Sequence, residues 1–185
     1  MACNAASQLT NLDPSCAALK QKGGLKKKVW AGLYENITMT VDGDGYVDSV
    51  TLDTLSPALH LNYFIGKKLK HNSVITGEIG ENANTLNQDL NLVLYAYSPE
   101  EKEAIENLFN SEEVVVYVET ESGKIEVYGY DTGLTASALT GGSGTALNDP
   151  TAITITLSGQ QDTLPKVAKF GATLADDIAY LVALQ

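Results

Sequence analysis

Apolar residues recur at every second position in several short runs of this sequence, and this spacing constrains the fold more than any other feature. The clearest run is residues 152–157, where Ile153, Ile155 and Leu157 alternate with alanine and threonine. Because successive side chains of a strand point to opposite faces, the run predicts a strand with one buried face. A chain of 185 residues, 44% of them hydrophobic, is long enough to bury a core without disulfides or metals. We therefore expect a single mainly β domain.

Turn residues separate paired runs of this kind. The segment 42–45, Asp-Gly-Asp-Gly, lies between the alternating residues 35–41 and 46–52. A second pair, residues 114–118 and 125–130, flanks a short segment that contains Ser-Gly. Both arrangements predict antiparallel β-hairpins.

Three further segments have the composition of strands. We expect extended structure at residues 59–69 and 72–79, and a central strand at residues 90–97, which are apolar on both faces from Leu92 onward. Residues 141–150 contain Gly-Gly-Ser-Gly and Asn-Asp-Pro, which predict a flexible loop.

One helix is predicted at residues 98–110. Ser98 is a preferred N-cap residue, Pro99 suits the first helical position, and Glu101 completes a capping box. The residues that follow form an apolar stripe at helical spacing, which comprises Ala104, Ile105, Leu108 and Phe109. This helix is expected to lie on a sheet.

The two ends of the chain differ from its middle. Residues 1–30 are small, polar and irregular, with a lysine-rich part at 20–28, and are expected to form an arm or loop. Residues 31–170 are expected to form the β domain. In residues 171–185, Leu174, Ile178, Leu181 and Val182 recur at helical spacing, which predicts a short helix or docking arm.

The charged residues argue against a protein that binds and reads nucleic acids. All 12 basic residues are lysine, there is no arginine, and the net charge is −11. Arginine is the usual residue for bidentate recognition of guanine and phosphate, and a strongly negative protein repels nucleic acids.

The charge is also distributed unevenly along the chain. Residues 1–70 hold eight lysines against six acidic residues, whereas residues 71–185 hold four lysines against seventeen acidic residues. Unlike patches of this kind suit head-to-tail contacts between copies.

No nucleophile or phosphate-binding motif is complete. Around Ser143 the sequence is Gly-Gly-Ser-Gly-Thr, which lacks the last glycine of a hydrolase elbow, so a serine nucleophile with His60 or His71 as its base is disfavoured. Gly66-Lys67 and Gly123-Lys124 lack the serine or threonine that follows the lysine of a P-loop. We expect no enzymatic activity and no cofactor.

Metal ligation lacks the required spacing as well. Cys3 and Cys16 lie far apart in the chain, as do His60 and His71, so they form no zinc motif. Residues 42–53 begin like a calcium loop, but glycine and the last acidic residue stand at the wrong positions. The adjacent carboxylates Glu112 and Glu113 are expected to diverge to opposite faces of a strand. No catalytic, cofactor or metal residue is therefore assigned.

No run of residues is long and apolar enough to span a membrane, and the polar N-terminus does not read as a signal peptide. The sequence therefore predicts a protein made in the cytoplasm, without a membrane span.

The order of these parts resembles the tail-tube, or major tail, proteins of long-tailed bacteriophages. The likeness covers roughly residues 33–170. It is carried by the helix that opens at Ser98-Pro99-Glu100-Glu101, the hairpin from Val114 to Tyr130, and Gly144-Thr145-Ala146 ahead of the strand at Ile153. The lysine-rich segment 20–28 and the segment after Gly171 depart from the family.

The resemblance implies an antiparallel β-sandwich or barrel with a flanking helix. Its subunits would close into rings, typically hexameric, that stack head to tail into a tube. The partners would be further copies of the chain and other tail or neck proteins. DNA would be only a transient, non-specific passenger during ejection. The expected place is the virion tail, reached after synthesis in the cytoplasm of a host bacterium.

The sequence also leaves other functions open. A capsid decoration protein or a head–tail connector belongs to the same structural class. A small β-sandwich that binds a ligand such as a carbohydrate needs an exposed aromatic platform, for which only Trp30 and scattered tyrosines are available. A monomeric acidic β domain would also fit the composition.

Overall fold

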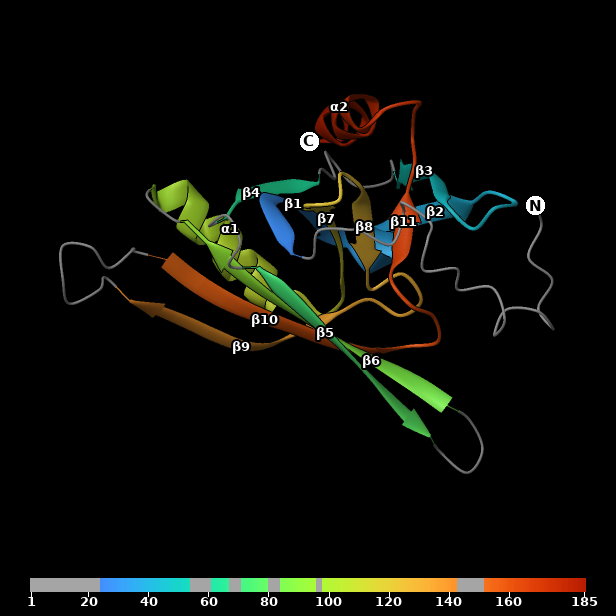
Figure 1. Ribbon diagram of the computed structural model, residues 1–185. Helices are drawn as coiled ribbons and strands as arrows, with labels where there is room; N and C mark the ends of the chain where they lie inside the picture. The colour runs from blue at the N-terminus through green and yellow to red at the C-terminus, as the bar shows by residue number, and fades with distance from the viewer. Residues whose placement is uncertain (1–23, 54–60, 67–70, 80–83, 96–97, 143–151) are drawn as a thin grey trace.

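The computed structural model describes residues 24–53, 61–66, 71–79, 84–95, 98–142 and 152–185. Within these ranges the chain forms two packed β-sheets and two α-helices (Figure 1). The prediction of a mainly β sandwich with a flanking helix is confirmed, and over the described residues the sheets do not close into a barrel. No helix in the described ranges combines the length and apolarity needed to cross a lipid bilayer.

The larger sheet has seven strands in the described residues, in the order β2-β3-β11-β8-β7-β1-β4. Its neighbours are antiparallel except for the short parallel contact between β11 and β3. The 3-10 turn η3 (Tyr34–Asn36) joins β1 to β2. The strands are β1 (Leu25–Leu33), β2 (Ile37–Val41), β3 (Val47–Leu52), β4 (Asn62–Ile65), β7 (Val114–Thr120), β8 (Ile125–Tyr128) and β11 (Lys166–Ala168).

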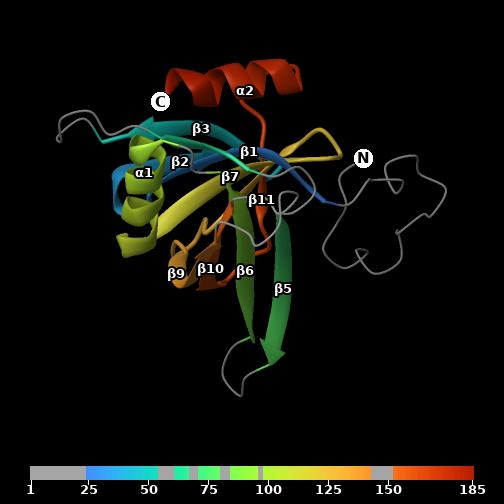
Figure 2. The ribbon, with the colours of Figure 1, turned by 90° about the vertical axis from the view of Figure 1, so that its left-hand side faces the viewer.

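The smaller sheet is antiparallel throughout and has the order β5-β6-β10-β9 in the described residues. Its β5–β6 hairpin extends away from the rest of the molecule, as both views show (Figures 1 and 2). The strands are β5 (Asn72–Ile79), β6 (Asn84–Leu94), β9 (Thr135–Gly142) and β10 (Ala152–Gln161).

The larger sheet is covered on both faces. The smaller sheet and α1 (Pro99–Asn110) lie on one side, and α2 (Leu174–Ala183) lies on the other (Figure 2). Two separate apolar cores follow from this layering. Val116 and Leu92 belong to the core between the sheets, whereas Trp30 and Leu181 belong to the core beneath α2.

Strand β7 explains why both faces of the larger sheet must be covered by other elements. Its residues Val114–Thr120 are all buried, and successive side chains alternate between the two cores. A strand with apolar residues on both faces is stable only where both faces are covered. From the sequence, coverage of both faces was expected for residues 90–97. Instead β6 ends at Leu94, and its buried leucines face only the core between the sheets.

Both helices have the capping interactions that their sequences predict. In α1 the Ser98 hydroxyl accepts a hydrogen bond from the Glu101 backbone N–H, and the Glu101 carboxylate accepts one from the Ser98 N–H. Thr173 and Asp176 form the same box at the start of α2. The helical prediction for residues 171–185 is therefore confirmed, as is the predicted helix at 98–110.

Strand β1 begins at Leu25, inside the range 1–30 that the sequence analysis gave to an arm. The lysines after it belong to the sheet: Lys26 forms an ion pair of 2.8 Å with Glu119 of β7. Residues 1–23 lie outside the described ranges. The loop predicted from residue 141 is also wrong at its start, because Gly141 and Gly142 pair with β10 as the end of β9.

Candidate assembly interface

The outer strands of the smaller sheet are the most distinctive surface of the described chain. Strand β5 pairs with β6 and strand β9 pairs with β10, and no strand in the described ranges pairs with their other edges. An unpaired edge presents a row of backbone N–H and C=O groups that another strand can extend.

Both edges carry little of the usual protection against pairing. Proteins block exposed edges with lysine, proline, bulges or very short strands. Strand β9 has the sequence Thr-Ala-Ser-Ala-Leu-Thr-Gly-Gly and holds no charge or proline, although it has one bulge opposite β10. Strand β5 holds one charged residue, Glu78. The edge strands of the larger sheet, β2 and β4, are shorter.

The two edges are offset along the strand direction. Val74, Asp89, Ser158 and Thr135 lie in one row across the sheet through their successive pairings. From this row β5 continues one way to Ile79 and β9 continues the opposite way. A second copy placed beside the first must therefore be shifted along the strands before the edges can pair over their length. A sheet that closes on itself requires tilted strands and a staggered register of the same kind.

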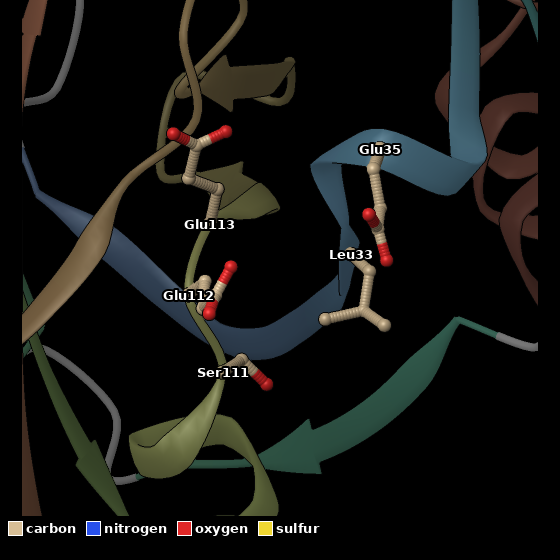
Figure 3. Close-up of a pocket in the computed structure, with 5 residues that line it drawn as sticks. All are labelled: Leu33, Glu35, Ser111, Glu112 and Glu113. Atoms are coloured by element: carbon tan, nitrogen blue, oxygen red, sulfur yellow. The ribbon is translucent and has the colours of Figure 1, made fainter.

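The larger sheet carries an acidic hollow of about 390 Å³ at one end of β1. Leu33 and Glu35 line one side of it, and Ser111, Glu112 and Glu113 line the other (Figure 3). The Ser111 hydroxyl is already occupied, because it donates a hydrogen bond of 2.7 Å to the backbone carbonyl of Asn107 in α1.

The acidic residues at this end of β1 also affect the pKa of a nearby tyrosine, Tyr34. Burial is the main cause that raises the pKa of Tyr34, and the charges of Asp131 and Glu113 raise it further. At the other end of β1 stand Lys26, Lys27 and Lys28, next to the end of β7. At this end Lys26 is paired with Glu119 and Glu121 lies beside Gly24, so the excess positive charge rests on Lys27 and Lys28, opposite in sign to the acidic hollow at the other end.

The expectation for Glu112 and Glu113 requires a correction. They do not alternate within a strand, because β7 begins only at Val114, and both line the same hollow. No group of three or more histidine, cysteine, aspartate or glutamate side chains in the described ranges is arranged to hold a metal ion.

Several residues considered from the sequence lie outside the described ranges, namely Cys3, Cys16, His60 and Ser143. His71 is buried, and its Nδ1 accepts a hydrogen bond from the Val93 backbone N–H. Trp30 has no exposed surface, so it provides no aromatic platform for a ligand. The Asp42 carboxylate accepts hydrogen bonds from the N–H groups of Asp44 and Tyr46, which confirms the hairpin turn there.

The edge strand β9 was not predicted from the sequence. Its alanines, threonines and glycines lack the β-branched alternation of β10, so they resemble loop residues. One sequence signal was available, because residues 132–148 contain no charged side chain. A long uncharged segment in a chain of net charge −11 is better explained by a covered surface than by a solvated loop.

Comparisons of this chain with protein-family models, with curated proteins and with solved structures give no match.

Proposed function

We propose that this chain is a structural virion protein that assembles with copies of itself into stacked rings, which form the tail tube of a bacteriophage. The observation that carries the proposal is the pair of long edges on the smaller sheet that no strand of the described residues covers. Unlike surfaces on one subunit make a heterologous contact, which closes into a ring or continues as a filament.

The strand directions support this form of association. Strand β5 runs in the same direction as β10 and therefore opposite to β9. Adding β5 of a second copy to β9 of the first continues the antiparallel alternation. It also keeps the inner face of each sheet on the same side.

Charge supports the stacking of rings and the passage of DNA. The basic and acidic ends of the β1–β7 pair are complementary surfaces for a head-to-tail contact. A chain without arginine and with a net charge of −11 offers few binding sites to a DNA backbone, which suits a conduit through which DNA slides.

The test is to place a lysine on a free edge. Wild-type protein is expected to form rings or tubes in negative-stain electron microscopy. Thr140→Lys in β9 or Thr76→Lys in β5 puts a charge on an exposed edge position and is expected to leave folded monomers. Thr51→Lys is the control, because Thr51 is also exposed but lies in β3 of the larger sheet, away from both edges of the smaller sheet.

A strictly monomeric wild-type protein at high concentration would contradict the proposal. Assembly that both edge variants leave unchanged would contradict the role of the edges. Single rings that never stack would favour a head–tail connector, which uses the same kind of contact without a tube.

A further inference from the structure

The β5–β6 hairpin carries apolar side chains on its inner face, beyond the part that the larger sheet covers. Ser73 marks that face, because its hydroxyl is hydrogen-bonded, at 2.9 Å, to the hydroxyl of Tyr128 in the core. Ile75 and Ile79 follow at even spacing and share the face, yet they are 40% and 91% exposed. Leu86, which is partly buried, lies opposite Gly77 on the same face.

Leu164 extends this surface from a different part of the chain. Gln88, the cross-strand partner of Ile75, donates a hydrogen bond of 3.0 Å from its Nε2 to the carbonyl of Thr163. That bond holds the segment before β11 over the root of the hairpin. Leu164 follows directly and is 59% exposed. We call Ile75, Ile79, Leu86 and Leu164 the hairpin ledge.

A second apolar surface lies at the opposite side of the smaller sheet. Leu139 of β9 pairs with the buried Ile155 and so faces inward, but it is 37% exposed. Helix α1 packs beside β9. Asn107 points toward β4, where it lines a hollow with Asn62. Phe109 is two positions further on, roughly 200° around the helix from Asn107, and is 37% exposed. We call Leu139 and Phe109 the β9 patch.

The ledge and the patch fit each other in register as well as in chemistry. Opposite residues of neighbouring strands share a face, so the shift between copies is an even number of residues. Counted from the row of Val74 and Thr135, a shift of about four residues, roughly 13 Å, sets Ile75 of one copy opposite Leu139 of the next. Both surfaces then lie on the inner side of a continuous sheet.

We infer that the hairpin ledge of one copy packs against the β9 patch of the next copy, beneath its helix α1, with the copies staggered along the strands. This contact rests on the proposed function and specifies its side-by-side interface. Neither surface is charged, and each is incomplete alone. The occupant of the ledge is therefore a second copy of this chain.

Cysteine cross-linking tests the contact directly. In a Cys3→Ser, Cys16→Ser background, Ile75→Cys and Leu139→Cys are introduced together and treated with a short bismaleimide under assembly conditions. A ladder of covalent oligomers is expected on a denaturing gel. Each single variant is expected to stay monomeric on that gel, because a heterologous contact never brings two copies of one position together.

The matched control combines Ile75→Cys with Val182→Cys. Val182 is 49% exposed on α2, on the far side of the larger sheet, and is expected to give no ladder. If microscopy shows rings but the pair at 75 and 139 gives no more ladder than this control, the contact is wrong and the proposed function stands. If wild-type protein forms no oligomer, both are wrong.

Charge placed on the ledge gives a second measurement. Ile79→Asp and Leu164→Asp are each expected to raise the concentration needed for half-assembly at least tenfold, whereas Val182→Asp is expected to leave it unchanged. Both ledge positions are exposed in the subunit, so circular dichroism should show an unchanged fold. An assembly threshold equal to that of wild type in both ledge variants would overturn the inference.

Discussion

The imidazole of His71 is held by the backbone of Val93, whose N–H donates a hydrogen bond of 3.0 Å to its Nδ1. The ring is only 3% exposed and stands against Gly66, where the end of β4 meets β6. Because Nδ1 accepts a hydrogen bond, the native ring must be neutral. Burial lowers the pKa of His71 to about 4.

Acid should therefore destabilise the subunit through His71. An unfolded histidine takes up its proton near pH 6.5, whereas the native ring does so only near pH 4, so protons favour unfolding between these values. The free energy of unfolding is expected to fall by about 3 kcal/mol on acidification through this window. Urea unfolding curves at a series of pH values measure this loss.

His71→Gln separates this effect from the titration of carboxylates. Glutamine can still accept from Val93 but does not titrate, so its stability should depend less on pH. Wild-type and variant profiles that run parallel from pH 6.5 to about 4 would show that His71 does not carry the effect.

Gly66 is expected to tolerate no side chain. A Cβ atom at this position would stand 1.9 Å from the Nε2 of His71 and 2.6 Å from the carbonyl oxygen of Val93. Gly66→Ala must push the ring or the strand aside, at an expected cost of about 2 kcal/mol or more in unfolding free energy. Gly43→Ala is the control, because its Cβ would meet no atom within 4 Å. Equal stability of the two variants would contradict the packing described.

Local sequence signals predicted the elements that are stabilised locally. The capping box of Ser98 and Glu101, the Asp42 turn and the alternation of Ile153, Ile155 and Leu157 each depend on residues close in the chain. These signals specified α1, the β2–β3 hairpin and most of β10.

Elements that depend on distant partners were not predictable. The lysines of β1 resemble a solvated segment until Glu119 is placed beside Lys26 by the β1–β7 register. Strand β9 has little strand propensity and is held by its pairing with β10. The location of the candidate interface was therefore not predicted. Assembly itself was expected, from the charge pattern and from the expectation that the sheet edges are covered.

Asp177 anchors α2 to the segment that follows β11. Its buried carboxylate accepts hydrogen bonds from the N–H groups of Phe170 and Gly171, at 2.7 and 2.9 Å. Asp177→Ala leaves both donors without their partner and is expected to lower the unfolding free energy by about 2–3 kcal/mol. Asp176→Ala removes only the exposed capping box and should cost about 1 kcal/mol.

Trp30 reports on the same anchor. It is the single tryptophan of the chain and lies in the core beneath α2 with Leu181. Loosening of α2 in Asp177→Ala should increase the quenching of Trp30 fluorescence by acrylamide, under conditions in which the protein remains folded. Quenching equal to that of Asp176→Ala would mean that α2 is held chiefly by its apolar contacts.

Salt concentration should distinguish the charged stacking contact between rings from the uncharged side-by-side contact within a ring. The ends of β1 are about 30 Å apart, well beyond the Debye length of about 8 Å at physiological salt, so their charges remain available to neighbouring copies. The ledge contact is uncharged. Raising the salt from about 0.05 to 0.5 M is therefore expected to shorten tubes into rings without dissolving the rings, as seen by microscopy and sedimentation.

Charge exchange tests which residues carry the stacking contact. Glu112→Lys with Glu113→Lys, or Lys27→Glu with Lys28→Glu, should each give rings that do not stack at low salt. Combining all four substitutions restores opposite charges between neighbouring copies and should restore tubes. Among the described residues neither lysine pairs with an acid in the way that Lys26 pairs with Glu119, and these changes leave that ion pair intact. Tubes that persist in both double variants would exclude the two ends of β1 as the stacking surfaces.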